Sequence, residues 1–438
     1  MKKIWNGFLD LIDYENIDFI SFMLMIIWSI SPIVEYISKF FIKKYISFYF
    51  VSMIYLIGIV GILVYIIYLG KIIKDKKFHL KDIIPQLLIL SMLIIAFISS
   101  LLSSNMHLSF YGNTYRKEGL FVYIMYIGFI LASSTIKDEK YKIDIFKTII
   151  FSACFITIVP YFLGNFKYTG FTNIFSNTNH YAYYLMIATS LSGLLTLYVS
   201  KYKKILYYLI YIFLLYVLIM NNTFGCYLAL FISLLCLLVY SLIKKKRRIN
   251  ALILLVSFVL LSFFVSHYNI QLFSSGKEHT NIVSNNINTF TNDIKKSLDT
   301  KDKNHEKAGS GRIKLWKGAI SYTLDHPIFG GGMECLDKYY FDTYNSTIGR
   351  PHNIFLQISS FIGIPGAIIY LALILYLAKA NLKNLLNPIN IIIYFTAMSY
   401  FISSMFGNSM YYTSPYFMIL LGLLIGMKNS MAKLDVKK

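Results

Sequence analysis

The sequence predicts an all-α polytopic membrane protein, and three observations lead to that fold class. Of the 438 residues, 57% are hydrophobic and only 14% are charged, which is too apolar for a soluble domain. About twelve apolar runs approach the ~20 residues that a helix needs to cross a bilayer. A long polar segment then separates the ninth run from the tenth. We therefore expect about 12 transmembrane helices with a large extracytoplasmic loop between the ninth and the tenth.

The predicted spans begin near twelve positions: Ile17, Ile46, Ile83, Gly119, Ile145, Tyr181, Ile205, Thr223, Asn250, Asn353, Pro388 and Tyr411. The apolar stretch 204–243 is about twice the length of one span and is interrupted at 220–223, which predicts two helices joined by a tight turn. The chain then divides into an N-terminal transmembrane bundle of about nine spans at 1–265, the loop at 266–352, and about three C-terminal spans at 353–438.

The formal charge of +21 lies largely in short basic clusters between apolar runs, such as the one from Lys244 to Arg248. Clusters in that position indicate topology rather than binding of nucleic acid. An even number of spans puts both termini on one side, which is also the side of the loops richer in Lys and Arg. Both termini are therefore predicted to be cytoplasmic, although Lys39, Lys43 and Lys44 fall on the opposite side. The large loop is then extracytoplasmic, on a multi-pass protein of the cytoplasmic membrane.

The large loop has two halves of different composition. Residues 273–309 are rich in Asn, Ser, Lys and Asp and offer too little apolar surface to offset the entropy of ordering, so we expect a mobile arm. Ser310 then suits the N-cap of an amphipathic helix that ends before Pro327. The glycines at 330–332 predict a turn around a ligand or a hinge. The apolar residues of the helix recur at three- and four-residue spacing, at Ile313, Trp316, Ile320 and Leu324.

Five cations lie near the outer membrane boundaries, where short loops are usually poor in Lys and Arg. They are Arg116, Lys117, Lys167, Arg312 and Arg350. An arginine side chain binds phosphate well because its planar guanidinium donates two parallel hydrogen bonds. These residues therefore predict a site for an anionic lipid headgroup or a lipid-linked pyrophosphate. The alternative is that each cation reaches the phosphates of ordinary lipids.

His352 is the candidate general base. It stands at the boundary of the tenth span between Pro351 and Asn353, where a neutral imidazole can accept a proton from a hydroxyl near neutral pH. Asn353 would orient the imidazole or bind a hydroxyl. The alternative is an interfacial histidine that caps the following helix. Trp316 and the outer tyrosines would stack on sugar rings, or else they form the aromatic belt of the interface.

The sequence offers no arrangement typical of a metal site. The outer histidines lack the spacing of zinc ligands, and the four cysteines are scattered along the chain. Neither paired carboxylates nor an Asp-x-Asp motif stand near the outer boundaries, which disfavours a metal-dependent glycosyl transfer. We therefore expect neither a metal ion nor another cofactor.

Short motifs follow one another in a specific order along the second half of the chain. They are Ser-Gly-Arg-x-x-x-Trp at 310–316, Pro-x-x-Gly-x-Gly at 327–332, His-Asn-x-x-Leu at 352–356 and Gly-x-Pro-Gly at 363–366. Earlier stretches add Arg-x-x-Gly at 116–119, Gly-x-x-Asn at 170–173 and Asn-Thr-Asn at 177–179. In this order the motifs resemble those of the O-antigen ligases and the related O-antigen polymerases, over about 116–366. Two positions depart from the family's pattern, because Lys167 stands where the family often has arginine and Thr178 replaces the usual proline.

This resemblance implies a GT-C-like fold and a polysaccharide ligase or polymerase. Such an enzyme transfers a glycan, without a metal, from undecaprenyl pyrophosphate to an acceptor hydroxyl at the outer face of the cytoplasmic membrane. Arg116 and Arg312, helped by Lys167 and Arg350, would hold the pyrophosphate, and His352 would take the proton of the hydroxyl. The acceptor would be a glycan, a wall polymer, a lipid or a protein. Richness in Ile, Lys, Asn and Tyr indicates an AT-rich genome and favours a wall or capsular polysaccharide of a Gram-positive bacterium over lipopolysaccharide.

Two other functions fit a chain with about twelve spans. A polytopic transporter or a lipid-linked glycan flippase would place ionisable residues or broken helices near the middle of the membrane. Here the polar residues gather at one face, which favours transfer. A non-catalytic assembly subunit would lack an outward cavity beside His352.

Overall fold

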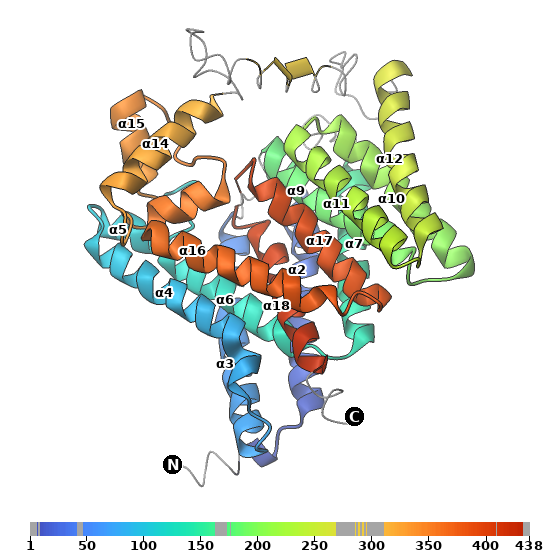
Figure 1. Cartoon of the computed structure of the whole chain (residues 1–438), viewed down its shortest axis with the longest axis horizontal. Coiled ribbons are helices and arrows are strands. Elements are labelled where there is room, and N and C mark those ends of the chain that lie inside the picture. Colours follow the sequence, from blue (N-terminus) through green and yellow to red (C-terminus); the bar gives the residue numbers. More distant parts are fainter. Residues whose placement is uncertain are drawn as a thin grey trace.

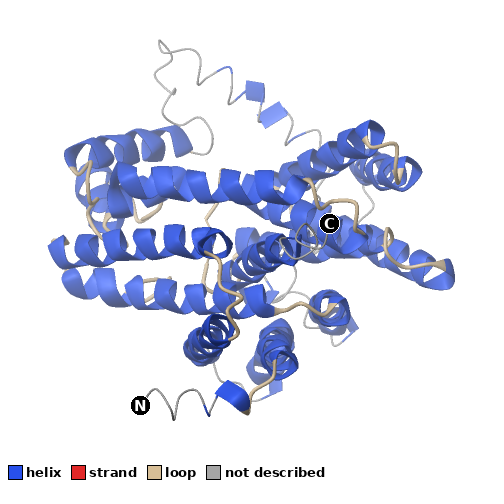
Figure 2. Cartoon of the chain, turned by 60° about the horizontal axis from the view of Figure 1, so that its bottom comes forward, coloured by secondary structure: helices blue, strands red, loops and turns tan. Residues whose placement is uncertain are grey.

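The structure is a computed structural model that describes residues 9–41, 47–162, 173–175, 177–268, 311–408 and 410–431, with Gly7 and isolated residues between 285 and 295. All regular secondary structure in these ranges is helical (Figures 1 and 2). The predicted all-α class is therefore confirmed for the described part of the chain. Lys167, Ser310 and nearly all of the predicted arm at 273–309 lie outside the described residues.

Twelve apolar helices in the described part of the chain coincide with the twelve predicted runs. They are α2 (Tyr14–Phe41), α3 (Ser47–Lys74), α4 (Ile84–Leu102), α6 (Leu120–Thr135), α7 (Glu139–Phe162), α9 (Thr178–Leu195), α10 (Lys201–Met220), α11 (Phe224–Ile243), α12 (Arg248–Tyr268), α16 (Ile354–Leu382), α17 (Pro388–Ser404) and α18 (Ser414–Met431). Eight of them are long and apolar enough to cross a membrane, by length and composition. Helices α6, α17 and α18 are apolar but shorter, and the twelfth helix, α9, belongs to neither group. The chain is thus a polytopic membrane protein, and the count of about twelve spans stays a prediction.

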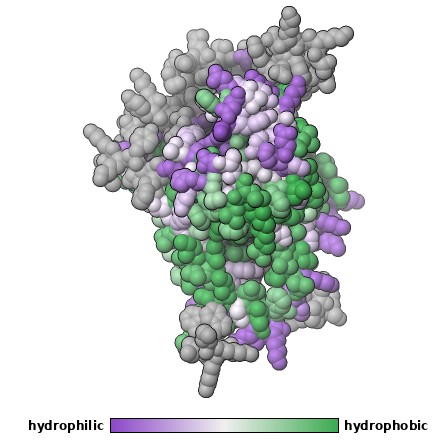
Figure 3. Space-filling model, turned by 90° about the vertical axis from the view of Figure 1, so that its left-hand side faces the viewer, coloured by the Kyte–Doolittle hydropathy of each residue, from purple (hydrophilic) through white to green (hydrophobic). Residues whose placement is uncertain are grey.

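The surface of the molecule is layered as a membrane requires. Figure 3 shows a hydrophobic belt with hydrophilic side chains above and below it. The first turns of α2 and the last turns of α18 lie toward the bottom of Figure 1, whereas α14 (Arg312–Asp325) and α15 (Leu336–Tyr344) lie toward the top. Both ends of the described chain are therefore on one side and the loop helices are on the other, as an even number of spans demands.

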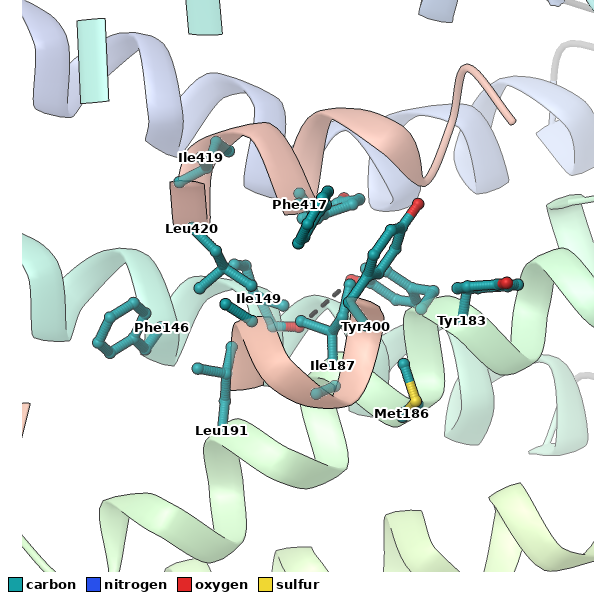
Figure 4. Packing of buried hydrophobic residues seen from close by; sticks show 14 of the residues in the cluster. Phe146, Ile149, Tyr183, Met186, Ile187, Leu191, Tyr400, Phe417, Ile419 and Leu420 are labelled. Carbon is teal, nitrogen blue, oxygen red and sulfur yellow. Dashed lines mark hydrogen bonds between the residues drawn. The ribbon is translucent and has the colours of Figure 1, made fainter. Parts of the chain in front are cut away.

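The core of the bundle forms around α9. Every residue of α9 from His180 to Leu195 is buried, and the helix packs against α7, α10, α11 and α17. Figure 4 shows aromatic rings where these helices meet α18. The ring of Tyr400 stacks on that of Phe417 with centroids 4.6 Å apart, and the ring of Tyr183 lies 5.1 Å from that of Tyr400. A helix that touches protein on all sides tolerates polar side chains that a lipid-facing helix does not, which explains why α9 is less apolar than α10, α11 and α17.

A helix was predicted before Pro327, and the structure has α14 there, with Gly311 rather than Ser310 as its N-cap. The helix begins at Arg312 after Gly311, whose φ of +82° places it in the left-handed region, and ends at Asp325 before Pro327. Its buried face carries Leu315 and Ala319. The predicted stripe faces away from this contact, since Ile320 and Leu324 are exposed. An exposed apolar stripe at the edge of the hydrophobic belt suits contact with lipid.

The glycine turn at 330–332 fastens the loop to α16. The backbone N–H groups of Gly331 and Gly332 donate to the carbonyls of Ser360 and Phe361 at 2.9 and 3.1 Å. These carbonyls are free because α16 is kinked at Gly363, which has a φ of +75°. The glycines therefore form a turn, and its partner is the kinked helix α16.

Helices α3 and α6 approach each other backbone to backbone at glycines. Gly58 and Gly61 of α3 face Met125 and Gly128 of α6, and a Cβ placed at Gly128 would overlap the backbone of Gly58. Small residues at such a crossing allow the close packing that holds membrane helices together.

We expect Gly128→Ala to destabilise the protein by about 1–3 kcal/mol, because the added methyl group must push α3 and α6 apart. Thermal unfolding of the purified protein in detergent measures this loss. Gly225→Ala is the matched control, since a Cβ there meets no atom closer than the Cβ of Phe406 at 3.6 Å. Equal melting temperatures for the two variants would contradict the close helix contact.

Candidate active site

Five charged side chains from distant parts of the chain form a buried ion network at the end of the bundle next to α14 and α15. Its members are Arg116, Glu118, Glu334, Asp337 and Arg350. Arg350 donates to Glu118 Oε2 at 2.7 Å and to Glu334 Oε1, while Arg116 donates to Asp337 Oδ1 at 2.8 and 3.0 Å. Glu334 Oε2 also lies 3.4 Å from Arg116 Nη1. Glu334 therefore joins the two arginine pairs into one network.

Arg350 is the centre of the network and has no exposed surface. Burial opposes the charge of the guanidinium, but the carboxylates of Glu334 and Glu118 outweigh this effect and raise the pKa of Arg350 above its usual value. Arg350 was predicted to help bind substrate. The structure places it out of reach of solvent and commits its two terminal nitrogens to carboxylates.

The three carboxylates correct an expectation drawn from the sequence, which found no paired carboxylates near the outer boundaries. Glu118 precedes α6, whereas Glu334 and Asp337 lie three residues apart at the start of α15. The proximity of Glu118 to the other two carboxylates therefore has no local sequence pattern. The sequence did contain one indication that Glu118 belongs to the site, because it directly follows Arg116 and Lys117, two of the candidate cations. Within the described residues, no group of three or more His, Cys, Asp or Glu side chains is placed to hold a metal ion.

Asp337 forms the accessible end of the network. Its Oδ2 accepts from Asn113 Nδ2 at 2.6 Å, and Asn113 Oδ1 accepts from the backbone N–H of Arg116 at 2.6 Å. Burial raises the pKa of Asp337 while the charge of Arg116 opposes the rise. Gly349 packs directly on this pair, and a Cβ at Gly349 would collide with both Asp337 Oδ1 and Arg116 Nη2.

A polar cavity of about 690 Å³ opens beside the network. Arg116, Asp337 and His352 all line it. Four asparagines share the lining, at Asn113, Asn177, Asn179 and Asn408. Amide side chains offer paired donors and acceptors, which suit the hydroxyl groups of a sugar. Two of the predicted catalytic residues, from opposite ends of the resemblance, therefore meet in one cavity.

His352 enters this cavity from a strained backbone position, with a φ of +54°. Its Nε2 lies 3.3 Å from Asn408 Nδ2, and its buried Nδ1 has no hydrogen-bond partner among the described residues. Burial lowers the pKa of His352 to about 4, and the charges of Arg312 and Arg116 act in the same direction. The imidazole is therefore neutral and able to accept a proton. Asn408 was missed by the sequence analysis.

Arg312 and Trp316 of α14 act on the same region. Arg312 is half-buried at the start of the helix and is close enough to His352 for its charge to lower the pKa of the imidazole. Trp316 was predicted to bind substrate or to stand in the interface belt. Its indole Nε1 donates to the carbonyl of Pro351 at 2.7 Å. Trp316 therefore fixes the backbone immediately before His352.

The remaining predicted site residues have other positions. Asn353 caps α16, because its Oδ1 accepts from the backbone N–H groups of Phe355 at 3.0 Å and Leu356 at 3.2 Å. The capping role that was left open for the histidine thus belongs to its neighbour. Lys117 is half-buried in a turn with a φ of +53°. Lys167 lies outside the described residues.

An apolar cavity of about 170 Å³ lies on the other side of the network, between α4, α6, α16, α17 and α18. Tyr126 and Ser414 line it, and both bond to Glu118 Oε1, at 2.5 and 3.2 Å. The ion network therefore separates a polar cavity from an apolar one.

We expect Arg350→Ala to destabilise the fold by about 3–5 kcal/mol, because it leaves two buried carboxylates without their cation. The yield of monodisperse protein and its melting temperature in detergent measure the effect. Lys338→Ala is the control, since Lys338 is an exposed cation that lines the polar cavity. If the two variants were equally stable, the network would not hold the site together.

Comparison with known proteins finds a family match for one segment of the chain. Residues 209–371 match the family model of O-antigen ligase, and no curated protein matches the chain. The matched segment contains Arg312, Arg350 and His352, while Arg116 reaches the same cavity from outside it. The resemblance inferred from the motifs is confirmed for this segment, which is similar to the O-antigen ligase domain.

Proposed function

We propose that the protein is a metal-independent glycosyltransferase of the outer face of the cytoplasmic membrane. It transfers a glycan from undecaprenyl pyrophosphate to the hydroxyl of an acceptor, as a polysaccharide ligase or polymerase. The observation that carries the proposal is the meeting of Arg116 and His352 in one polar cavity, with the charge of Arg312 acting on His352. A phosphate ligand and a neutral base are the two groups that this reaction needs.

In this mechanism the bond between the anomeric carbon and the phosphate oxygen breaks, and a bond from that carbon to the acceptor oxygen forms. Arg116 and Arg312 stabilise the negative charge that develops on the departing diphosphate. His352 takes the proton of the acceptor hydroxyl and later releases it to water. Asn408, with its amide turned to accept from Nε2–H, leaves the partnerless Nδ1 as the base.

Two of the predicted residues act on the site through other residues. Arg350 holds the segment before His352 against Glu118 and Glu334. Trp316 fixes the carbonyl of Pro351. Such positioning matters because misplacement of a base by about 1 Å can cost on the order of 100-fold in rate.

The two cavities suit the two ends of the donor. The apolar cavity would receive the isoprene units next to the diphosphate, and the amide-lined polar cavity would receive sugar. The acceptor class, whether glycan, wall polymer, lipid or protein, is set by residues that the cavity alone does not identify.

A transporter or flippase is favoured less by this arrangement. Transport sites lie near the middle of the bilayer, often at broken helices. Here the charged cluster lies at the outer ends of α5 (Met106–Tyr111), α6 and α16, next to the loop helices (Figure 1). The kink of α16 is filled by the glycine turn through backbone hydrogen bonds.

We expect His352→Ala to lower transfer by about 10²–10⁴-fold and Arg312→Ala by about 10²–10³-fold, because the first removes the base and the second a charge that stabilises the transition state. The measurement is transfer from a defined lipid-linked donor to an acceptor glycan in proteoliposomes that contain EDTA.

The control variants remove a histidine and a cation from other positions in or next to α14. His326→Ala removes an exposed histidine, and Lys317→Ala removes an exposed cation of α14. Both should transfer at the wild-type rate. Full activity of His352→Ala and Arg312→Ala would refute the mechanism, and loss of all transfer in EDTA would refute metal independence.

The pH profile gives an independent test. Because His352 must be neutral and its pKa in the empty site is lowered to about 4, kcat/KM should fall only below about that pH. A bound diphosphate offsets the positive charge of the arginines, so the acid limb of kcat should lie at higher pH. Arg312→Gln should move the limb of kcat/KM to higher pH, and Lys317→Gln should not. An acid limb that neither donor nor Arg312→Gln displaces would rule out His352 as the base.

A further inference from the structure

The guanidinium of Arg116 already holds an anion from its own chain. Both of its terminal nitrogens donate to Asp337 Oδ1, at 2.8 and 3.0 Å. Both nitrogens meet one oxygen here rather than the two oxygens of a parallel pair, but they are the same donors that arginine uses to bind a phosphate group. Asp337 therefore occupies the donors on Arg116 that the proposed function assigns to the diphosphate.

The net charge of the network also affects the competition between Asp337 and an anionic ligand for Arg116. Two arginines and three carboxylates give the network a formal net charge of −1 when all are ionised. An anionic ligand that reaches Arg116 must therefore displace or neutralise a carboxylate. Glu118 and Glu334 are 1% and 0% exposed and are bound to Arg350, whereas the side chain of Asp337 is 24% exposed. Asp337 is the member of the network that can move.

Asp337 also has other partners when it leaves Arg116. Asn113 Nδ2 holds its second oxygen at 2.6 Å. The residue lies in the first turn of α15, where the backbone N–H groups and the helix dipole favour a carboxylate. It borders the polar cavity together with Lys338, so it has space and a cation on the cavity side. The exchange therefore does not strand a buried charge.

A bilayer presents every interfacial arginine with a large excess of phospholipid headgroups. We propose that Asp337 is a specificity-determining residue, which screens Arg116 from ligands with a single phosphate group and is displaced only by the diphosphate of the donor. This inference rests on the proposed function, because it concerns the same donor site. When one phosphodiester replaces the carboxylate of Asp337 on Arg116, one negative charge replaces another and the gain in binding free energy is small. A diphosphate carries more charge, and the charges of Arg116 and Arg312 both act on the cavity residue His352. It should therefore displace Asp337 where a single phosphate group does not.

The test compares two ligands that differ by one phosphate group. Farnesyl diphosphate and farnesyl monophosphate are titrated calorimetrically into the full-length protein in a neutral detergent. Wild-type protein should prefer the diphosphate. Asp337→Asn should bind the monophosphate about tenfold more tightly than wild type, with a smaller gain for the diphosphate, so that the preference falls. Asp337→Ser is a second uncharged variant, in case the amide disturbs folding.

Asp342→Asn is the matched control, because it removes one negative charge from an exposed position of the same helix. It should leave the preference unchanged. If the Asp337 variants bind both ligands more weakly, or keep the wild-type preference, Asp337 only positions Arg116 and the inference is wrong while the proposed function stands. If neither wild type nor variant binds the diphosphate, the donor site itself is refuted.

Discussion

The arrangement of the site depends on one buried interaction, the pairing of Arg350 with Glu118 and Glu334. Removing three charges from water is costly unless each is paired in good geometry, so this contact tolerates little displacement. It ties together the entry to α6, the start of α15 and the residues before α16. His352 lies two residues beyond Arg350, so the pairing of Arg350 with the two carboxylates also sets the position of His352.

Other contacts also attach the loop helices to the membrane helices. Trp316 holds the carbonyl of Pro351, and the glycine turn bonds to the kink of α16. Asn353 caps the helix that follows. Several weak constraints of different kinds thus converge on a short stretch, and together they can sustain the positive φ of His352.

The ion network also divides the molecule into two environments. On one side the lining is apolar and formed by membrane helices, and on the other it is polar and rich in amides. A lipid-linked glycan has this same division along its length, with the diphosphate at the junction. The proposed donor site and the proposed selectivity of Asp337 both follow from charged groups held at that junction.

The sequence by itself determined the helices, because hydrophobic length and the lack of charge act locally and leave a continuous signal along the chain. It also determined the candidates Arg116, Arg312 and His352, since these residues stand in short motifs next to the ends of apolar runs. Only the tertiary structure decided the partners: Asp337 for Arg116, Glu118 and Glu334 for Arg350, and Asn408 for His352. These side chains come from loops and helix ends that are distant in the chain, where no periodicity records the contact. The charged side chains become buried and paired only when the helices pack against one another.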